Sequence, residues 1–289
     1  MQKEINVKMG GRFGDFIHSL VFCYYYYKKY NKKTKLFMTR DYPSYSNLPR
    51  IAQTTITLEH GDQFLMGAEN TYKSLYNLIS EQPYISSFEL YDNQQVDYNS
   101  NLFRTSLWQN KVGWTDLFMN TLAPEITERY TNIKLIQVSN RLNDYTDCIV
   151  IHRKPNYIVN GVEIDTFDAN SESLYTKITK KHKCIFLTQT HDVHLYEKFP
   201  LNNKIELITA NTLEEVFLIL SSAKYYIGNT TGISAIAHAV NTPRLLELSP
   251  YFVDTQHYIG ETLYYNNLSY IIDTINYIAV DSIVYNIFK

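Results

Sequence analysis

The stretch that most constrains the fold runs from Ser221 to Leu248 and reads SSAKYYIGNTTGISAIAHAVNTPRLLEL. A short apolar run at residues 225–227 is followed by a turn rich in Gly, Asn and Thr at residues 228–232. A helix of small residues at 233–240 and a second apolar run after Pro243 come next. Apolar runs of this length around such a turn and a short helix predict the strand, loop, helix and strand of an open α/β sheet.

The predicted turn offers several hydrogen-bond donors to an anion. It places backbone N–H groups and two threonine hydroxyls at the carboxyl end of a strand, directly ahead of a helix N-terminus. Open α/β sheets bind ligands at that edge, and a helix N-terminus favours phosphate. We therefore expect Asn229, Thr230, Thr231 and Gly232 to bind a phosphate-bearing ligand. A tight packing turn, which needs Gly and Ala for steric reasons alone, is the structural alternative.

A second glycine-rich loop follows the first predicted strand, at residues 5–9. Residues 10–15 read Gly-Gly-Arg-Phe-Gly-Asp, and apolar residues then recur at helical spacing from Phe16 to Tyr25. The loop lacks the G-x-G-x-x-G form, so by itself it is a weak signal of nucleotide binding. Asp15 begins the predicted helix, where a carboxylate either serves a ligand or simply interacts favourably with the helix dipole.

Together, the two loops resemble the ADP-heptose:lipopolysaccharide heptosyltransferase family. GGRFGDFIHSL resembles that family's Leu-Gly-Asp-x-(Ile/Leu)-His signature through Gly14, Asp15, Ile17 and His18, with Phe13 in place of Leu. The later stretch resembles the family's donor-binding segment, with Gly-Asn-x-x-Gly, an Ala-rich helix, x-x-Pro and an apolar strand. The resemblance implies the GT-B architecture, an α/β fold of two Rossmann-like, doubly wound domains that face a cleft.

The resemblance also implies a reaction. It indicates a glycosyltransferase that moves a sugar, with inversion, from a nucleoside diphosphate sugar to a hydroxyl acceptor on a glycan or glycoconjugate. No metal or other cofactor is expected. Asp15 would be the catalytic base and His18 a secondary site residue. The donor would be bound by the residues of the first loop together with the turn at 229–232; those of the first loop are Gly10, Gly11, Arg12 and Gly14.

Two positions depart from the family pattern. The family carries Asp where this chain has Thr230, and His where this chain has Ala235, with His238 one helical turn later. A hydroxyl accepts weaker hydrogen bonds from a sugar than a carboxylate does. We therefore expect a donor other than ADP-heptose, such as a UDP- or GDP-hexose. A sugar-nucleotide epimerase of the same fold and a non-catalytic sugar-nucleotide-binding protein are the alternatives.

The second half of the chain alternates strands and helices as a doubly wound domain does. Strands are predicted at 148–152, 184–188 and 205–209, and helices at 172–181, around Leu195 and after Asn211. Arg153 and Lys154 form a basic pair at the carboxyl end of the strand predicted at 148–152, which suits a diphosphate. Solvated surface charge would give the same pattern. The predicted donor-binding residues at these strand ends are His152, Arg153, Lys154, Thr188 and Gln189, with His191 as a secondary residue.

An Asn- and Asp-rich segment at 139–147 is predicted to link two domains. An acceptor-binding domain would cover residues 1–143 and a nucleotide-sugar-binding domain residues 147–265. Residues 266–289 have a helical apolar stripe, and the GT-B plan implies that this helix packs back on the first domain. Between the two loops, residues 102–122 are predicted to be helical and contain both tryptophans.

Composition excludes several classes of protein. With 45% hydrophobic and 19% charged residues, the 289-residue chain can bury a core, and a net charge of -2 offers no basic surplus for nucleic acid. The cysteines Cys23, Cys148 and Cys184 lie in apolar surroundings at no metal-like spacing, which indicates buried thiols. Neither a signal peptide nor an apolar run of the roughly 18–20 residues that span a bilayer is visible. We expect a soluble, cytoplasmic protein; peripheral contact with a membrane-borne acceptor and the oligomeric state stay open.

Overall fold

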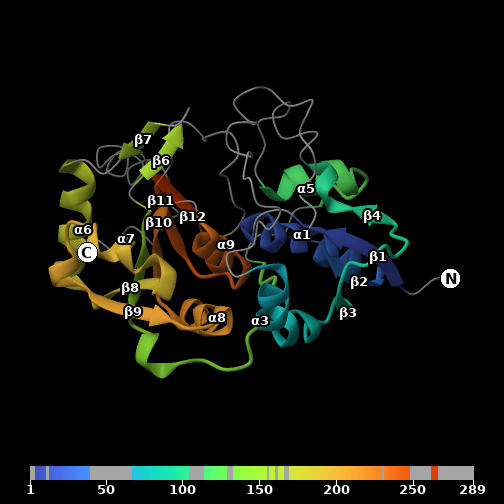
Figure 1. Cartoon of the computed structure of the whole chain (residues 1–289), viewed down its shortest axis with the longest axis horizontal. Coiled ribbons are helices and arrows are strands. Elements are labelled where there is room, and N and C mark those ends of the chain that lie inside the picture. The colour runs from blue at the N-terminus through green and yellow to red at the C-terminus, as the bar shows by residue number, and fades with distance from the viewer. Residues whose placement is uncertain are drawn as a thin grey trace. The chain divides into compact units, whose positions relative to one another are not determined.

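The computed structural model in Figure 1 divides the chain into two compact units, the first reaching residue 137 and the second beginning at residue 138. The residues described are 4–10, 13–39, 67–103, 114–128, 133–154, 156–159, 162–165, 169–229, 231–247 and 262–265. The predicted terminal helix at 266–289 and Trp108 lie outside these ranges. Within the described residues, no helix is long and apolar enough to cross a membrane.

The first unit is built on a four-stranded parallel sheet with the strand order β3-β2-β1-β4. The chain runs outward from β1 through β2 to β3 and then returns to the other side of β1 as β4. The strands are β1 (Glu4–Met9), β2 (Lys33–Met38), β3 (Ile85–Leu90) and β4 (Tyr98–Asn99). The helices are α1 (Phe13–Tyr30), α3 (Ala68–Ser80) and α5 (Trp114–Leu122), with a 3-10 turn η1 (Ser100–Leu102) after β4.

Helix α1 confirms the apolar stripe predicted after the first glycine-rich loop. Its first turns are buried on almost every side, and the helix packs against α5 and β2. Lys28 and Lys29 occupy the last turn, where cations interact favourably with the helix dipole. Asn31, with a φ of 53°, adopts the left-handed conformation that commonly ends a helix, and its N–H donates to the Tyr27 carbonyl at 2.8 Å.

The second unit contains a six-stranded parallel sheet with the order β12-β11-β10-β5-β8-β9. Its strands are β5 (Ile149–His152), β8 (Cys184–Gln189), β9 (Glu206–Ala210), β10 (Tyr225–Asn229), β11 (Arg244–Glu247) and β12 (Thr262–Tyr265). Its helices are α6 (Ala169–Lys181), α7 (Val193–Glu197), α8 (Leu213–Ser222) and α9 (Gly232–Ala239), with 3-10 turns η2 (Asn143–Tyr145), η3 (Thr190–Asp192) and η4 (Asn202–Lys204). The predicted alternation of strands and helices in this half is confirmed.

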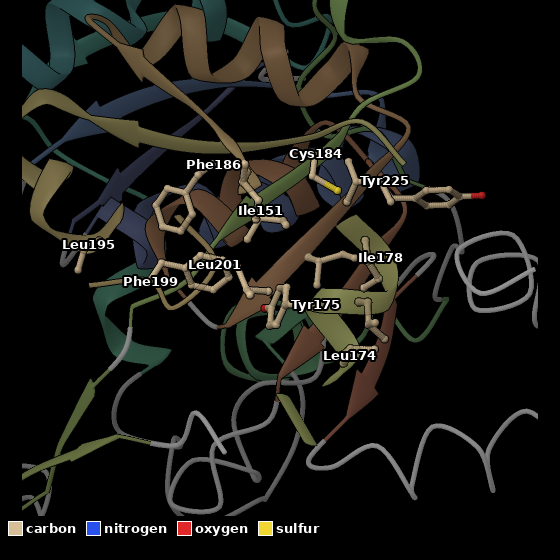
Figure 2. Close-up of a cluster of buried hydrophobic side chains, with 14 residues drawn as sticks. Ile151, Leu174, Tyr175, Ile178, Cys184, Phe186, Leu195, Phe199, Leu201 and Tyr225 are labelled. Atoms are coloured by element: carbon tan, nitrogen blue, oxygen red, sulfur yellow. The ribbon is translucent and has the colours of Figure 1, made fainter. Parts of the chain in front are cut away.

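The central strands of this sheet are buried on both faces, as their continuous apolar runs predict. Figure 2 shows one of the two faces, where α6 and the segment around α7 pack on alternate strand residues. The cluster comprises Ile149, Ile151, Leu174, Tyr175, Ile178, Cys184, Phe186, Leu195, Phe199, Leu201, Ile205, Tyr225, Ile227 and Leu245. The burial of Tyr175 and Tyr225 here shows that part of the tyrosine-rich composition serves the core.

A short antiparallel hairpin, β6 (Asn156–Val159) and β7 (Val162–Asp165), follows β5; these two strands are absent from the sequence-based prediction above. Two alternating segments separated by the dipeptide Asn-Gly in the sequence are a strong hairpin signal, so this element was predictable from the sequence.

The three cysteines are free and buried, as predicted. Burial raises the pKa of the Cys23 and Cys184 thiols to about 12 and also raises the pKa of Cys148. All three therefore stay protonated at neutral pH.

Candidate functional site

The strand order of the second unit identifies the carboxyl-terminal edge of its sheet, where the parallel strands end, as the candidate site. The chain runs outward from β5 through β8 to β9 and then returns to the other side of β5 as β10. Ligands of open α/β sheets bind at such a switch point, at the carboxyl ends of the two diverging strands. β5 ends at His152 and β10 at Asn229, and His152 pairs with Gly228 in the parallel register. Two of the predicted donor-binding segments therefore leave the sheet side by side.

Asn229 joins the two segments through its side-chain amide. Its Nδ2 donates to the Lys154 carbonyl oxygen at 2.6 Å, and its Oδ1 accepts from the Lys154 backbone N–H at 3.1 Å. Asn229 is 1% exposed, so its amide is buried, whereas Lys154 lies at the surface. Because both polar groups of one amide bind one backbone residue, the loop after β5 is fixed to the end of β10.

Close packing of β5 against β10 requires glycine at position 228. A Cβ atom there would lie 1.9 Å from the His152 carbonyl oxygen and 2.8 Å from the Tyr226 hydroxyl oxygen. The Tyr226 hydroxyl donates to that same carbonyl at 3.3 Å. Tyr226 was not among the predicted site residues, and its place within an apolar run gave no signal of this role.

His152 is a buried, neutral histidine. It is 3% exposed, and its Nδ1 lies 2.8 Å from the Leu187 carbonyl oxygen on β8, so Nδ1 carries the proton. The pKa of His152 is lowered to about 4, chiefly by burial and to a smaller extent by the positive charge of Lys154, while the Leu187 carbonyl and the charge of Asp192 oppose the shift. His152 therefore joins β5 to β8 at neutral pH and brings no positive charge to the edge.

The predicted basic pair is divided between two environments. Arg153 is 1% exposed and is one of the largest fully buried side chains, whereas Lys154 is exposed. A guanidinium stays protonated when buried, and it is the cation that pairs best with phosphate or carboxylate groups. The two cations therefore cannot act as one surface patch: Lys154 is open to a ligand from solvent, and Arg153 holds its charge inside the protein.

Helix α9 begins at the switch point with a capping box. Thr231 is the N-cap; its hydroxyl accepts from the Ser234 N–H at 3.4 Å, and the Ser234 hydroxyl accepts from the Thr231 N–H at 2.9 Å. The predicted turn at 228–232 is shorter than expected, because β10 extends through Asn229 and α9 starts at Gly232. Thr230 lies outside the described residues. The amides of Gly232 and Ile233, in the first turn, have no acceptor within an α-helix.

The remaining predicted residues of this unit lie at the end of β8, next to β5. Thr188 and Gln189 are 0% and 5% exposed. His191 is largely accessible and lies 3.4 Å (Nε2 to Oδ2) from Asp192. The structure therefore brings the predicted residues of β5, β8 and β10 to one edge of one sheet, and their roles in donor binding stay predictions.

The first unit has its own switch point, between β1 and β4. Gly10 follows β1 and is buried, and Asp15 lies in the first turn of α1 at 7% exposure. His18, one helical turn further, is 3% exposed. Gly11 and Arg12 lie outside the described residues. Asp15 thus combines burial with a helix N-terminus, the position at which a carboxylate is most stabilised by the helix dipole.

Sequence reasoning missed two further polar residues at this edge, Ser100 and Asn101, which directly follow β4. Both are buried, at 1% and 7% exposure. β4 has only two residues, so no strand pattern in the sequence indicated that these side chains lie at the end of a strand.

Within the described ranges, no three His, Cys, Asp or Glu side chains are grouped so as to hold a metal ion. The expectation of a metal-independent reaction is not tested by this observation and stays a prediction.

Comparison with known proteins gives no match by sequence: no family model matches the chain, and neither does any curated protein. Solved structures do match. A glycosyl transferase family 9 protein from Veillonella parvula superposes with a TM-score of 0.58 at 11% identity, over 96% of this chain and 90% of that one. E. coli heptosyltransferase WaaC superposes with a TM-score of 0.51 at 12% identity, over 95% of this chain and 99% of that one. The glycosyltransferase TibC from enterotoxigenic E. coli superposes with a TM-score of 0.55 at 12% identity, over 93% of this chain and 68% of that one.

At such low identity the likeness establishes the fold. It extends over more than nine-tenths of the chain in all three structures and includes two heptosyltransferases, the family that the two sequence signatures resemble. The predicted fold class is therefore confirmed: this chain has the two-unit, Rossmann-like α/β fold of the GT-B glycosyltransferases.

Proposed function

We propose that the protein is a glycosyltransferase that moves a sugar from a nucleoside diphosphate sugar to a hydroxyl acceptor on a glycan or glycoconjugate. The observation that carries the proposal is the switch point of the second unit, where β5 and β10 end side by side and Asn229 fixes the loop after β5. That edge offers the first-turn amides of α9, the ammonium group of Lys154 and the amide of Gln189 to a diphosphate.

Structures of the same fold support a nucleotide as the ligand. The E. coli WaaC structure contains ADP, and a TibC structure contains ADP-D-beta-D-heptose. In the present chain the family's turn carboxylate is replaced by Thr230. We therefore propose a UDP- or GDP-hexose as the donor, because a hydroxyl cannot reproduce the charge-assisted bonds of a carboxylate to sugar hydroxyls.

The reaction assigned to Asp15 is general-base catalysis with inversion. The acceptor oxygen forms a bond to the anomeric carbon, and the bond from that carbon to the diphosphate oxygen breaks. The electron pair of the broken bond leaves with the diphosphate, and the acceptor proton moves to the Asp15 carboxylate. Hydrogen-bond donors at the β5 and β10 ends stabilise the charge that develops on the leaving diphosphate. The proposal requires no metal, so turnover should persist in EDTA.

The first experiment identifies the donor. Calorimetric titration of the protein with ADP, UDP and GDP sugars should show binding, strongest for a UDP- or GDP-hexose, and the bound donor should be hydrolysed slowly without acceptor. Preferential binding of ADP-heptose would contradict the proposed donor. Inversion at C2 of the sugar would indicate an epimerase instead, and binding without any turnover would indicate a non-catalytic protein.

The second experiment tests the site residues. Asp15→Asn should lower turnover by roughly 100-fold or more with donor affinity unchanged, the usual scale for loss of a general base. Asp116→Asn is the matched control, because Asp116 also lies in the first turn of a helix, α5. Gly232→Val should abolish nucleotide binding in a folded protein, since a branched side chain would occupy the first turn of α9. Activity of Asp15→Asn above a tenth of wild type, or nucleotide binding by a folded Gly232→Val variant, would overturn these assignments.

A further inference from the structure

The end of β4 reaches the same sheet edge as the glycine-rich loop of the first unit. The parallel register pairs Val7 with Tyr98 and Lys8 with Asn99, and η1 contacts β1. Ser100 and Asn101 follow β4 directly, in η1, and so leave the sheet at the end where β1 leads into Gly10. Carboxyl ends of neighbouring parallel strands lie at one edge of a sheet, so Ser100 and Asn101 share the ligand edge of this unit with Asp15.

The polar side chains of residues 99–101 differ in whether they form hydrogen bonds. Asn99 caps η1: its Oδ1 accepts from the Asn101 backbone N–H at 3.2 Å. By contrast, the Ser100 hydroxyl oxygen and the Asn101 Oδ1 atom are buried and have no hydrogen-bond partner within the described structure. Ser100 is 1% and Asn101 7% exposed. The Asn99 side chain therefore caps the turn, whereas the Ser100 hydroxyl and the Asn101 Oδ1 atom contribute no hydrogen bond to it among the described residues.

Buried polar atoms without partners destabilise a protein, and two adjacent ones at a ligand edge need an explanation. A ligand hydroxyl would supply it, because the Asn101 oxygen can accept a hydrogen bond and the Ser100 hydroxyl can donate one. A sugar hydroxyl both donates and accepts. The Asn101 Oδ1 atom is an acceptor and would repel an oxygen of a phosphate or carboxylate, so the pair favours a neutral ligand that can donate a hydrogen bond.

We propose that Ser100 and Asn101 form a subsite for the hydroxyl groups of a neutral sugar acceptor, at the same sheet edge as Asp15. The inference rests on the proposed function only in naming this sugar as the acceptor; the subsite itself follows from the two buried, unpartnered side chains. Both residues are positioning residues in this proposal, since they hold the acceptor and take no part in proton transfer.

The test uses Asn101→Leu, which keeps the approximate volume and removes both polar atoms, together with Ser100→Ala. Saturation-transfer NMR with a panel of methyl hexosides should show binding to the wild type and at least about tenfold weaker binding to Asn101→Leu, the loss expected for a buried hydrogen bond. The ligand-free variants should melt about 2–4 °C higher, because an unpartnered polar group is removed.

Thr34→Val is the matched control. Thr34 is fully buried in the same sheet, near the amino end of β2, where no acceptor is expected. This variant should bind the methyl hexosides as the wild type does. Absence of hexoside binding by the wild type, or equal binding by wild type and Asn101→Leu, would overturn the subsite.

Nucleotide titration of the same variants separates this inference from the proposed function. Nucleotide binding that is unchanged in Asn101→Leu, with hexoside binding lost, supports both proposals. Loss of hexoside binding in that variant when even the wild type binds no nucleotide would overturn the glycosyltransferase and still support a sugar subsite. Equal loss of nucleotide and hexoside binding in Asn101→Leu would mean a general structural defect and would overturn the subsite.

Discussion

The two switch points of the molecule differ in how their polar groups are satisfied. At the second unit's edge, the side chains of His152, Asn229 and Thr231 all bind backbone groups of their own unit. At the first unit's edge, the side-chain oxygens of Ser100 and Asn101 have no such partner among the described residues. The second edge is thus fixed before any ligand arrives, whereas the first leaves hydrogen-bonding capacity for one. Under the proposed function, the second edge would bind the diphosphate of the donor and the first edge the acceptor.

The largest expected effect comes from replacing the glycine that lets β5 approach β10. Gly228→Ala should lower the free energy of unfolding by at least about 3 kcal/mol, because the new methyl group meets the His152 carbonyl at 1.9 Å. Denaturant titration measures the change. Tyr226→Phe keeps the packing and removes only the hydroxyl, so it should lose about 1 kcal/mol. Equal losses in the two variants would show that the second edge is not fixed by close packing.

A slightly smaller effect is expected from acid. The His152 pKa falls from 6.5 in the unfolded chain to about 4 in the folded protein, so below pH 6.5 the unfolded state binds a proton that the folded state does not. The free energy of unfolding should therefore fall by up to about 3 kcal/mol as the pH drops from 6.5 to about 4. Stability curves of wild type and His152→Gln measure it.

The His152→Gln variant should lose this part of the pH dependence, while its amide can still donate to the Leu187 carbonyl. His191→Gln removes a histidine from the same sheet edge and should keep the dependence, because His152 is still present. Identical pH profiles for wild type and His152→Gln would refute the assignment.

A moderate effect is expected at the amide that joins the two loops. Asn229→Ala leaves the N–H and carbonyl groups of Lys154 without their partners and should cost about 2 kcal/mol. It should also weaken nucleotide binding by about tenfold, because the loop after β5 is no longer held in place. Asn202→Ala removes one exposed bond to the Glu197 carbonyl and serves as the control, with a loss of about 0.5 kcal/mol. Unchanged nucleotide affinity in Asn229→Ala would separate this bond from the site.

The smallest effect is expected at the N-caps of two helices. Comparing them separates a loss of stability from a loss of nucleotide binding. Thr231 caps α9 and Thr212 caps α8, each through a capping box. Thr231→Val and Thr212→Val should each lose about 1 kcal/mol of stability. Only Thr231→Val should also weaken nucleotide binding in calorimetry, since only α9 begins at the switch point. A loss of binding in both variants would indicate a general effect of helix fraying.

Sequence reasoning predicted the α/β fold, because continuous apolar runs between glycine-rich turns leave few alternatives. It also assigned His152 and Asn229, 77 residues apart, to donor binding near the ends of strands, and the structure places both at the carboxyl-terminal edge of one sheet. The predicted bounds of the turn at residues 228–232 were wrong. Gly228 and Asn229 are typical turn residues, yet they extend β10, since Gly228 faces a carbonyl where no side chain fits.

The division of the basic pair could not be predicted from the sequence. Neighbouring residues in an extended segment point to opposite sides, but nothing in Arg153-Lys154 tells which side is the interior. The polar edge of the first unit was missed for a related reason. A strand as short as β4 has no periodicity, so only its pairing with β1 shows that Ser100 and Asn101 lie at a strand end.

The three buried thiols make the molecule a reporter of its own local opening. Alkylating reagents need an accessible thiolate, and burial denies both access and ionisation to Cys23, Cys148 and Cys184. Cys23 belongs to α1 of the first unit, while Cys148 and Cys184 belong to the second. The labelling rate of each thiol therefore records how often its own unit opens, and ligand-induced slowing at one thiol alone would show which unit the ligand has bound.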